Sequence, residues 1–321
     1  MPSPTGFPVI ALEEHFLDDE ISAHFAGSDV LRLPPIQERL MDTGSHRLDE
    51  MDAAGIDIQV LSLGAPGTQK LPADKAADIT RAANDRLFEK IQKNSDRFAG
   101  FAALPTTDPD AAPNELDRAV KDLGFKGAMI HGLTNGAFID GKEFWPIFER
   151  AEALDVPIYL HPAFPHAPVV DAYYQPYVKD YPLFPTAAWG FGVEIGTEAI
   201  RLVLSGVFDA YPKLKIILGH LGESLPFLLW RIDHTLSRAG NNPVKFREIF
   251  CRNFWLTTSG NFSDPALLCT IQELGVDRIL FAIDWPFVVN TDGVDWLDNT
   301  SLSREDKAKI FHKNAERLLR M

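Results

Sequence analysis

The sequence opens with an apolar run that leads directly into two acidic residues and a histidine, Val9-Ile10-Ala11-Leu12-Glu13-Glu14-His15-Phe16. Such a run predicts a buried strand that ends where the polar residues begin. Side chains alternate between the faces of a strand, so we expect Glu13 and His15 to share a face and Glu14 to point away. A carboxylate and an imidazole on one face can bind a divalent metal. Taken alone, the segment supports another interpretation equally well, in which Glu13 and Glu14 are solvated loop residues and His15 lies next to a helix cap.

Four more titratable side chains directly follow apolar segments that read as strands: His131, His161, His220 and Asp284. A single histidine in such a place is most often a satisfied core residue. Residues at the same end of several parallel strands, however, surround one pocket, and this favours a shared metal site. Nitrogen and oxygen ligands without sulfur fit Zn²⁺ or Mn²⁺, with Mg²⁺ and Fe²⁺ as alternatives. Lys126 precedes the fourth predicted strand instead of following it, so we expect one metal ion.

The segment Gly219-His220-Leu221-Gly222-Glu223 adds a second chemical feature. Glycines on both sides of the histidine allow the backbone to approach a ligand closely. His220 and Glu223 could form a carboxylate–imidazole pair that relays a proton. The alternative is a helix N-terminus with Glu223 in its first turn, which the helix dipole favours. Both interpretations can hold together.

Predicted strands and helices alternate along the rest of the chain. After the opening strand, the predicted strands are residues 58–63, 98–103, 127–130, 157–160, 214–218, 254–257 and 278–283. The predicted helices are residues 48–54, 73–94, 109–123, 142–154, 193–205, 225–237, 265–274 and 304–321. Eight such units predict a single (β/α)₈ TIM-type barrel domain over residues 1–321. Two stretches without a steady period, 16–45 and 163–186, are predicted to be irregular and to form an inserted loop or lid.

Composition restricts the partners of this protein. The 321 residues are 45% hydrophobic and carry a formal net charge of −14, which argues against a nucleic acid or an anionic membrane as partner. A small anionic substrate is still compatible, because a metal can reverse the local field. The sequence has only two cysteines, no visible signal peptide and no apolar run near the roughly 20 residues that span a bilayer. We therefore expect a soluble, cytoplasmic protein.

Four motifs together resemble those of the amidohydrolase superfamily: Leu12-Glu13-Glu14-His15-Phe16, Tyr159-Leu160-His161-Pro162, Leu218-Gly219-His220-Leu221-Gly222-Glu223 and Ile283-Asp284-Trp285-Pro286-Phe287. The Glu-x-His opening, in place of His-x-His, most resembles the branch of metal-dependent, non-oxidative decarboxylases of hydroxybenzoates such as γ-resorcylate (2,6-dihydroxybenzoate) and 2,3-dihydroxybenzoate. The resemblance covers nearly the whole chain. It differs at His131, where those enzymes tend to have asparagine, at the run that ends in His166, and in the tyrosine-rich loop 168–185.

The resemblance implies a site and a reaction. One divalent metal would be held by Glu13, His15, His161 and Asp284. Asp284, His220 and Glu223 would handle protons, and the substrate contacts would include Phe287 and, from a neighbouring subunit of a homodimer or homotetramer, Arg231. The reaction would be decarboxylation of an ortho-hydroxylated benzoate by protonation of the ring carbon that bears the carboxylate, without an organic cofactor. Two alternatives use the same residues: hydrolysis of a lactone or amide by a metal-activated water, and a metal-binding scaffold without activity.

Overall fold

The computed structural model describes residues 5–25 and 34–321. Its strands are all parallel: β1 Ile10–Phe16, β2 Ile58–Leu63, β3 Phe98–Gly100, β4 Ala128–His131, β5 Pro157–His161, β6 Lys215–Leu218, β7 Phe254–Thr257 and β8 Ile279–Leu280. Neighbouring strands are hydrogen-bonded in chain order, from β1 through β2 to β3 in one sheet and from β4 through β8 in the other. Two single bridges, Ala102 with Ala128 and Leu12 with Ala282, connect these sheets at both edges. The strands therefore close into a ring, which confirms the predicted barrel.

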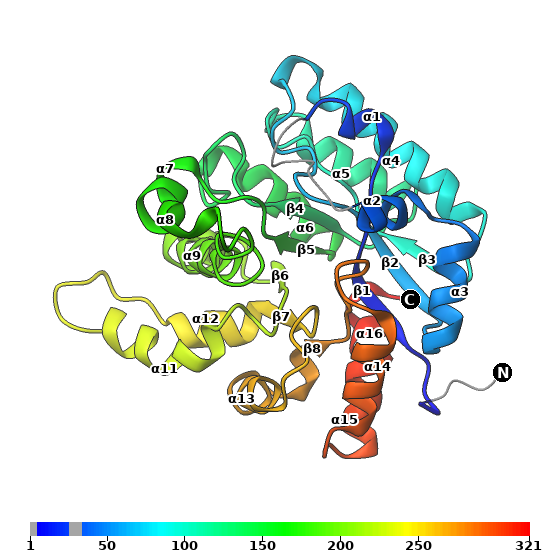
Figure 1. The fold of residues 1–321 in the computed structure, drawn as a ribbon. Helices are drawn as coiled ribbons and strands as arrows, with labels where there is room; N and C mark the ends of the chain where they lie inside the picture. The colour runs from blue at the N-terminus through cyan, green and yellow to red at the C-terminus, as the bar shows by residue number, and fades with distance from the viewer. Residues whose placement is uncertain (1–4, 26–33) are drawn as a thin grey trace.

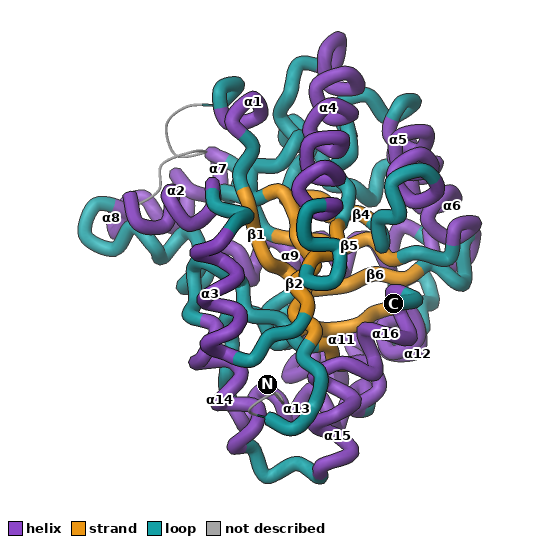
Figure 2. Tube along the Cα trace, turned by 90° about the vertical axis from the view of Figure 1, so that its right-hand side faces the viewer, coloured by secondary structure: helices purple, strands orange, loops and turns teal. Residues whose placement is uncertain are grey.

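Helices surround the ring of strands on the outside (Figures 1 and 2). The longer ones are α2 Pro34–Met41, α3 Ser45–Ala54, α4 Ala73–Gln92, α5 Ala112–Lys121, α6 Trp145–Leu154, α9 Gly190–Ser205, α11 Leu225–Leu236, α12 Phe246–Asn253, α13 Asp264–Leu274 and α14 Asn290–Asn299. The chain ends with α15 Arg304–Ala308, a π-helical turn Lys309–Lys313 and α16 Asn314–Leu319. Among the helices described, none combines the length and the apolar character needed to cross a bilayer.

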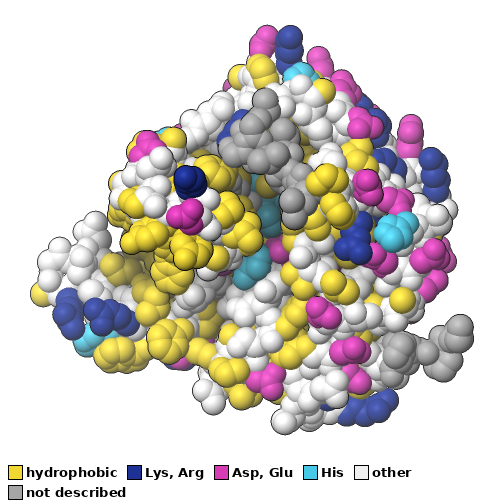
Figure 3. Space-filling model, viewed as in Figure 1, with side chains coloured by type: hydrophobic (Ala, Val, Ile, Leu, Met, Phe, Trp, Pro, Cys, Tyr) yellow, Lys and Arg dark blue, Asp and Glu magenta, His cyan; other side chains and the backbone are white. Residues whose placement is uncertain are grey.

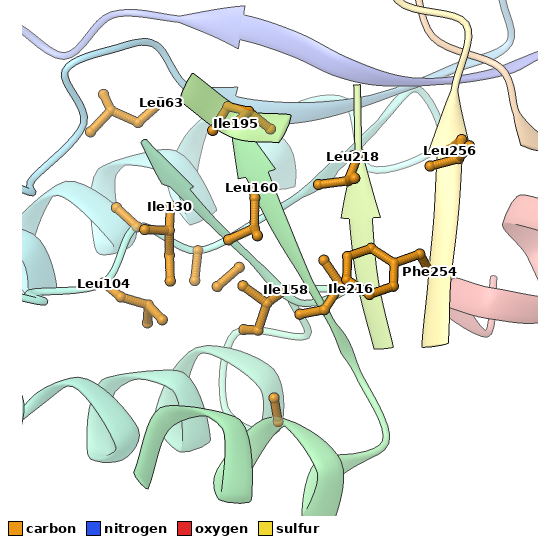
Figure 4. Close-up of a cluster of buried hydrophobic side chains, with 14 of the residues drawn as sticks. Leu63, Leu104, Ile130, Ile158, Leu160, Ile195, Ile216, Leu218, Phe254 and Leu256 are labelled. Carbon is orange, nitrogen blue, oxygen red and sulfur yellow. The ribbon is translucent and has the colours of Figure 1, made fainter. Parts of the chain in front are cut away.

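The core has two layers, because alternate strand residues face opposite sides. On β5, Ile158 and Leu160 point outward and pack with neighbouring strand residues beneath the helices (Figure 4). Tyr159 belongs instead to the cluster inside the barrel, which Leu318 and Leu319 of α16 also join. A packed interior fixes the strand ends in place, so a site at those ends is built on rigid elements.

The two stretches predicted to be irregular contain helices. The first includes α1 Asp19–Ser22 and α2, although residues 26–33 lie outside the described part of the chain. Pro34 and Pro35 occupy the first turn of α2, where a missing backbone N–H costs nothing. The second stretch includes α7 Ala167–Val169, a π-helical turn Val170–Tyr174 and α8 Gln175–Val178. The prediction for both stretches was wrong in this respect, and α12 and α14 were not predicted.

Strand β1 contains a bulge immediately before its polar end. In the pairing with β2, Ala11 lies opposite Gln59 but Glu14 lies opposite Leu61, so β1 has one extra residue at this point. Glu13, within the bulge, has a φ of 61°, a left-handed conformation that is unusual for a residue other than glycine.

The bulge decides which side chains enter the barrel. Ile10 and Leu12 face the interior, so uninterrupted alternation would bring Glu14 inside and leave Glu13 and His15 facing the helices. The extra residue reverses this order beyond Leu12. Glu13 and His15 share a face, as predicted, but simple alternation would have placed them on the wrong one.

Candidate metal centre and active site

Glu13, His15, His161 and Asp284 meet at the carboxyl ends of the strands. One potential ligand atom from each lies within 4.8 Å of all the others, and this is the one such group of three or more His, Cys, Asp or Glu residues found in the described chain. His15 Nε2 is 3.1 Å from His161 Nε2 and 3.3 Å from Asp284 Oδ1, and His161 Nε2 is 3.3 Å from Glu13 Oε1. Figure 3 shows histidine side chains at the floor of a hollow in the middle of this face.

The cluster has the properties of a metal site. Glu13 Oε1 and Asp284 Oδ1 are buried and have no hydrogen-bond partner, a costly state unless a cation is bound. Burial by itself would raise the pKa of Glu13, but His220 and His161 lower it far below its usual value, so the carboxylate is ionised. Two nitrogen and two oxygen donors suit Mn²⁺ or Zn²⁺.

The backbone is shaped to bring the two carboxylates inward. Asp284, in the loop after β8, has a φ of 75° and is in the left-handed region, as Glu13 is. Such strain is commonly found at functional sites, where the surrounding structure holds it. Gly219 makes room beside Glu13, because a Cβ there would lie 3.0 Å from Glu13 Oε2.

Hydroxyl groups hold the second oxygen of Glu13. The Tyr159 hydroxyl donates to Glu13 Oε2, and the Thr257 hydroxyl lies 3.2 Å from the same atom and 2.8 Å from the Tyr159 oxygen. Burial, followed by the nearby Glu13 charge, raises the pKa of Tyr159 well above its usual value, so the phenol stays a donor. These contacts leave Oε1 free for a metal. Sequence reasoning assigned no role to Tyr159, although it lies two residues before His161 and therefore points to the same side of β5.

Replacement of Tyr159 with phenylalanine should weaken metal binding without unfolding the barrel. Loss of an outer hydrogen-bond partner of a metal ligand typically costs about 10- to 100-fold in affinity, and we expect a change at the lower end of that range. Titration of metal-free protein with Mn²⁺ measures it. Tyr211→Phe, on a tyrosine that follows α10 Val207–Ala210 outside the cluster, is the matched control and should bind as the parent does. Unchanged Mn²⁺ affinity in Tyr159→Phe would show that the hydroxyl does not support Glu13.

Glu14, on the opposite face of β1, ties the Asp284 loop to the strand. Its two carboxylate oxygens accept hydrogen bonds from the backbone N–H groups of Ile283 at 2.9 Å and Trp285 at 3.3 Å. The Arg47 guanidinium lies 3.8 Å from the centre of the Trp285 ring and donates to the His15 carbonyl. Glu14 is therefore neither a ligand nor a solvated loop residue. It holds the segment that carries Asp284.

His220 and Glu223 form the predicted pair. His220 Nδ1 is 2.5 Å from Glu223 Oε1, and His220 Nε2 faces Glu13 Oε1 at 3.6 Å and Asp284 Oδ2 at 3.8 Å. Burial lowers the pKa of His220, but Glu223 and Glu13 raise it more, so the net pKa lies well above its usual value. The imidazole can therefore hold a proton at neutral pH beside the carboxylate of Asp284.

The remaining sequence candidates fall into two groups. Phe287 borders the cluster, since its ring centre is 6.0 Å from that of His15, and its side chain is half-exposed at the rim. His131 lies behind His161, with 3.0 Å between their Nδ1 atoms. Arg231 is exposed on α11 and is not brought into the cluster by its own chain. His166, at the N-cap of α7, is likewise outside the cluster.

Comparison with known proteins places the chain in a family. A family model described as amidohydrolase matches residues 23–321. The chain belongs to the amidohydrolase family.

The chain is also similar to several decarboxylases over nearly its whole length. The chain is 43% identical to a γ-resorcylate decarboxylase of Polaromonas sp., over 97% of this chain and 98% of the relative. A crystal structure of a dihydroxybenzoic acid decarboxylase from Polaromonas sp., with bound manganese and the inhibitor 2-nitroresorcinol, matches with a TM-score of 0.88 and 42% identity, over 98% of this chain and 97% of that one. A crystal structure of a 5-carboxyvanillate decarboxylase from Novosphingobium aromaticivorans, also with manganese, matches with a TM-score of 0.91 and 33% identity, over 99% of this chain and 97% of that one.

Proposed function

We propose that the protein is a metal-dependent decarboxylase of an ortho-hydroxylated benzoate, with 2,6-dihydroxybenzoate as the first substrate to test. One observation supports this most directly: the His220–Glu223 pair lies beside the cluster of metal-binding donors, which are Glu13, His15, His161 and Asp284. The similarity to γ-resorcylate decarboxylases over nearly the whole chain agrees with this chemistry.

Direct loss of CO₂ from an arene carboxylate would leave an unstable aryl carbanion, so the ring carbon must be protonated first. A C–H bond then forms at that carbon, the bond to the carboxylate breaks, and its electron pair returns to the ring as CO₂ leaves. When bound, a divalent cation supplies positive charge that orients an anionic substrate and lowers the pKa of its phenol group. No electron is transferred to the protein, so no organic cofactor is needed.

Asp284 is our candidate for the proton donor. Burial raises its pKa, but the nearby His15 and His220 side chains lower it more, so the net pKa lies below its usual value. A carboxyl group can donate a proton at neutral pH only if its pKa is raised, and the pKa of Asp284 is lowered instead. We infer instead that His220 stores the proton, held by Glu223, and passes it to Asp284 when substrate is bound. The 3.8 Å between His220 Nε2 and Asp284 Oδ2 is close enough for a small movement to complete this transfer.

Carbon dioxide release from a panel of hydroxybenzoates tests the proposal. We expect turnover of 2,6-dihydroxybenzoate, and less of 2,3-dihydroxybenzoate, by the manganese-loaded protein. Phe287 at the rim is the residue that we expect to contact the aromatic ring. If the protein releases no CO₂ from any hydroxybenzoate but hydrolyses lactones or amides, the proposal is wrong and the protein is a hydrolase.

We propose manganese as the bound ion, since two similar structures contain it, with zinc as the alternative for the same donor set. We also propose that residues 1–321 form one barrel domain and that the protein acts in the cytoplasm. The elements from β1 to α16 surround one core, and both cysteines, Cys251 and Cys269, are free, which suits a reducing compartment.

A second copy of the chain is the partner that we propose for the apolar surface around α11. Exposed aromatic and aliphatic side chains gather on α11 and on the segment 173–189 (Figure 3): Tyr173, Tyr177, Tyr181, Leu183, Trp189, Phe227 and Trp230. Exposed apolar side chains gathered on one surface commonly mark an interaction site. Arg231 is exposed and directly follows Trp230 on α11, so a homodimer or homotetramer formed through this surface would bring its guanidinium near a neighbouring subunit.

Replacement of Arg231 with alanine should lower kcat/KM by about 10- to 100-fold, the effect of losing one hydrogen bond to a charged group. The expected change is mainly in KM, with unchanged mass by light scattering. Arg238→Ala, which removes an exposed arginine just beyond α11, is the matched control. Parental kinetics in Arg231→Ala, or an active monomer, would exclude a substrate contact across subunits.

A further inference from the structure

His131 is a buried histidine that the proposed chemistry does not use, yet it touches a candidate metal ligand. Its Nδ1 lies 3.0 Å from Nδ1 of His161, and its Nε2 lies 2.6 Å from the carbonyl oxygen of Leu63 at the end of β2. The side chain is almost fully buried, and its backbone N–H donates to Gln69 Oε1 at 3.2 Å. The ring therefore bridges β2 and β5 behind the metal cluster.

The hydrogen-bond network allows one proton arrangement that is compatible with metal binding. A backbone carbonyl can only accept, so Nε2 of His131 must carry the proton that goes to Leu63. In the neutral ring, Nδ1 of His131 is then an acceptor, and Nδ1 of His161 must be the donor. A proton on Nδ1 leaves Nε2 of His161 with a free lone pair, and this is the nitrogen that faces Glu13 Oε1 and His15 Nε2.

We propose that His131 is a positioning residue that fixes the tautomer and orientation of His161, so that His161 Nε2 is presented to the metal. Metal-binding histidines usually donate their second N–H to a carboxylate, carbonyl or water, and here a second imidazole, itself anchored to Leu63, takes that place. The carbonyl of Pro162, 2.7 Å from His161 Nδ1, shares the same proton. This inference rests on the metal centre of the proposed function.

The surroundings of His131 are built to keep the ring in this position. Gly67, with a φ of 62°, lies against the ring, and a Cβ at this residue would be 2.6 Å from His131 Cδ2. The close packing against Gly67 restricts movement of the ring on that side, and the hydrogen bond to the Leu63 carbonyl holds Nε2. The bond to His161 is therefore set by the fold before a metal arrives.

Two measurements test the inference. Long-range ¹H–¹⁵N correlation spectra of the parent protein, labelled with ¹⁵N-histidine and loaded with diamagnetic Zn²⁺, report which ring nitrogen carries the proton. We expect His131 to be protonated at Nε2 alone and His161 at Nδ1. A proton on Nδ1 of His131 would overturn the proposal, and this result does not depend on any variant folding.

The second measurement is Mn²⁺ affinity, determined by chelator competition. We expect His131→Leu to bind about 10- to 100-fold more weakly, and His131→Asn, which keeps an acceptor oxygen near the place of Nδ1, to stay within about 3-fold of the parent. His312→Leu, which removes a buried histidine paired with Glu316, is the control and should bind as the parent does. Equal affinity in a folded His131→Leu would show that Pro162 suffices, whereas absence of Mn²⁺ binding in the parent would reject the metal centre itself.

Discussion

Asp284→Asn is expected to reduce turnover of a hydroxybenzoate by about 10³-fold or more, because a proton-transferring group typically contributes 10²- to 10⁴-fold and this residue also faces the metal. Its Oδ1 is 3.3 Å from His15 Nε2, and its Oδ2 is 3.8 Å from His220 Nε2. An amide at this position can neither accept a proton from His220 nor deliver one to a ring carbon. Release of CO₂ at saturating substrate measures the effect.

The fold should tolerate the substitution, since Asp284 Oδ1 has no hydrogen-bond partner to lose. We expect the same circular dichroism spectrum and a similar Tm, with metal content measured in parallel. Asp292→Asn, an exposed aspartate at the start of α14, is the matched control and should retain parental activity. If Asp284→Asn with a full complement of metal keeps more than about a tenth of parental turnover, proton transfer by Asp284 is excluded.

Removal of the divalent metal should abolish activity, and addition of Mn²⁺ should restore it. Without a cation, the ionised Glu13 and Asp284 carboxylates have buried, unpartnered oxygens, and their charges repel an anionic substrate. Binding should also stabilise the fold by about 2.7 kcal/mol when free Mn²⁺ is 100 times its Kd. Activity and Tm are followed together through chelation and add-back.

Replacement of His15 with alanine provides the control for this experiment, since it removes one of the four converging donors. We expect its Tm to respond far less to added Mn²⁺ than that of the parent. Addition of Zn²⁺ and Mg²⁺ in place of Mn²⁺ identifies the ion that supports the highest turnover. Full activity in thoroughly stripped protein would contradict a metal-dependent reaction.

Sequence reasoning predicted the barrel and a set of polar residues at its strand ends, and the resemblance to decarboxylases selected the four candidate ligands, which the structure brings together. The apolar segments that end at His161 and Asp284 are short, bounded and separated by helices, and this local pattern alone predicts parallel strands whose ends meet. The residues of the His220–Glu223 pair were equally visible, because three positions along the chain are enough to bring them together. Such features depend on local sequence and on a general rule of the fold.

Irregular segments were beyond this reasoning. Pro34 and Pro35 begin a helix instead of interrupting one, and a sequence pattern does not distinguish these two places.

The role of Glu14 depends on backbone N–H groups of Ile283 and Trp285, which lie more than 260 residues further along the chain. Contacts of that separation exist only once β1 and β8 are side by side.

The sequence by itself determined which side chains could bind a metal and which strand ends carry them, because residue type and hydrophobic periodicity are local properties. The tertiary structure decided how they are aimed. The bulge in β1 turns Glu13 and His15 into the barrel, the Tyr159 hydroxyl selects which Glu13 oxygen stays free, and the Leu63 carbonyl sets the proton of His131. Each of these depends on strand pairing across the closed ring, which no single segment encodes.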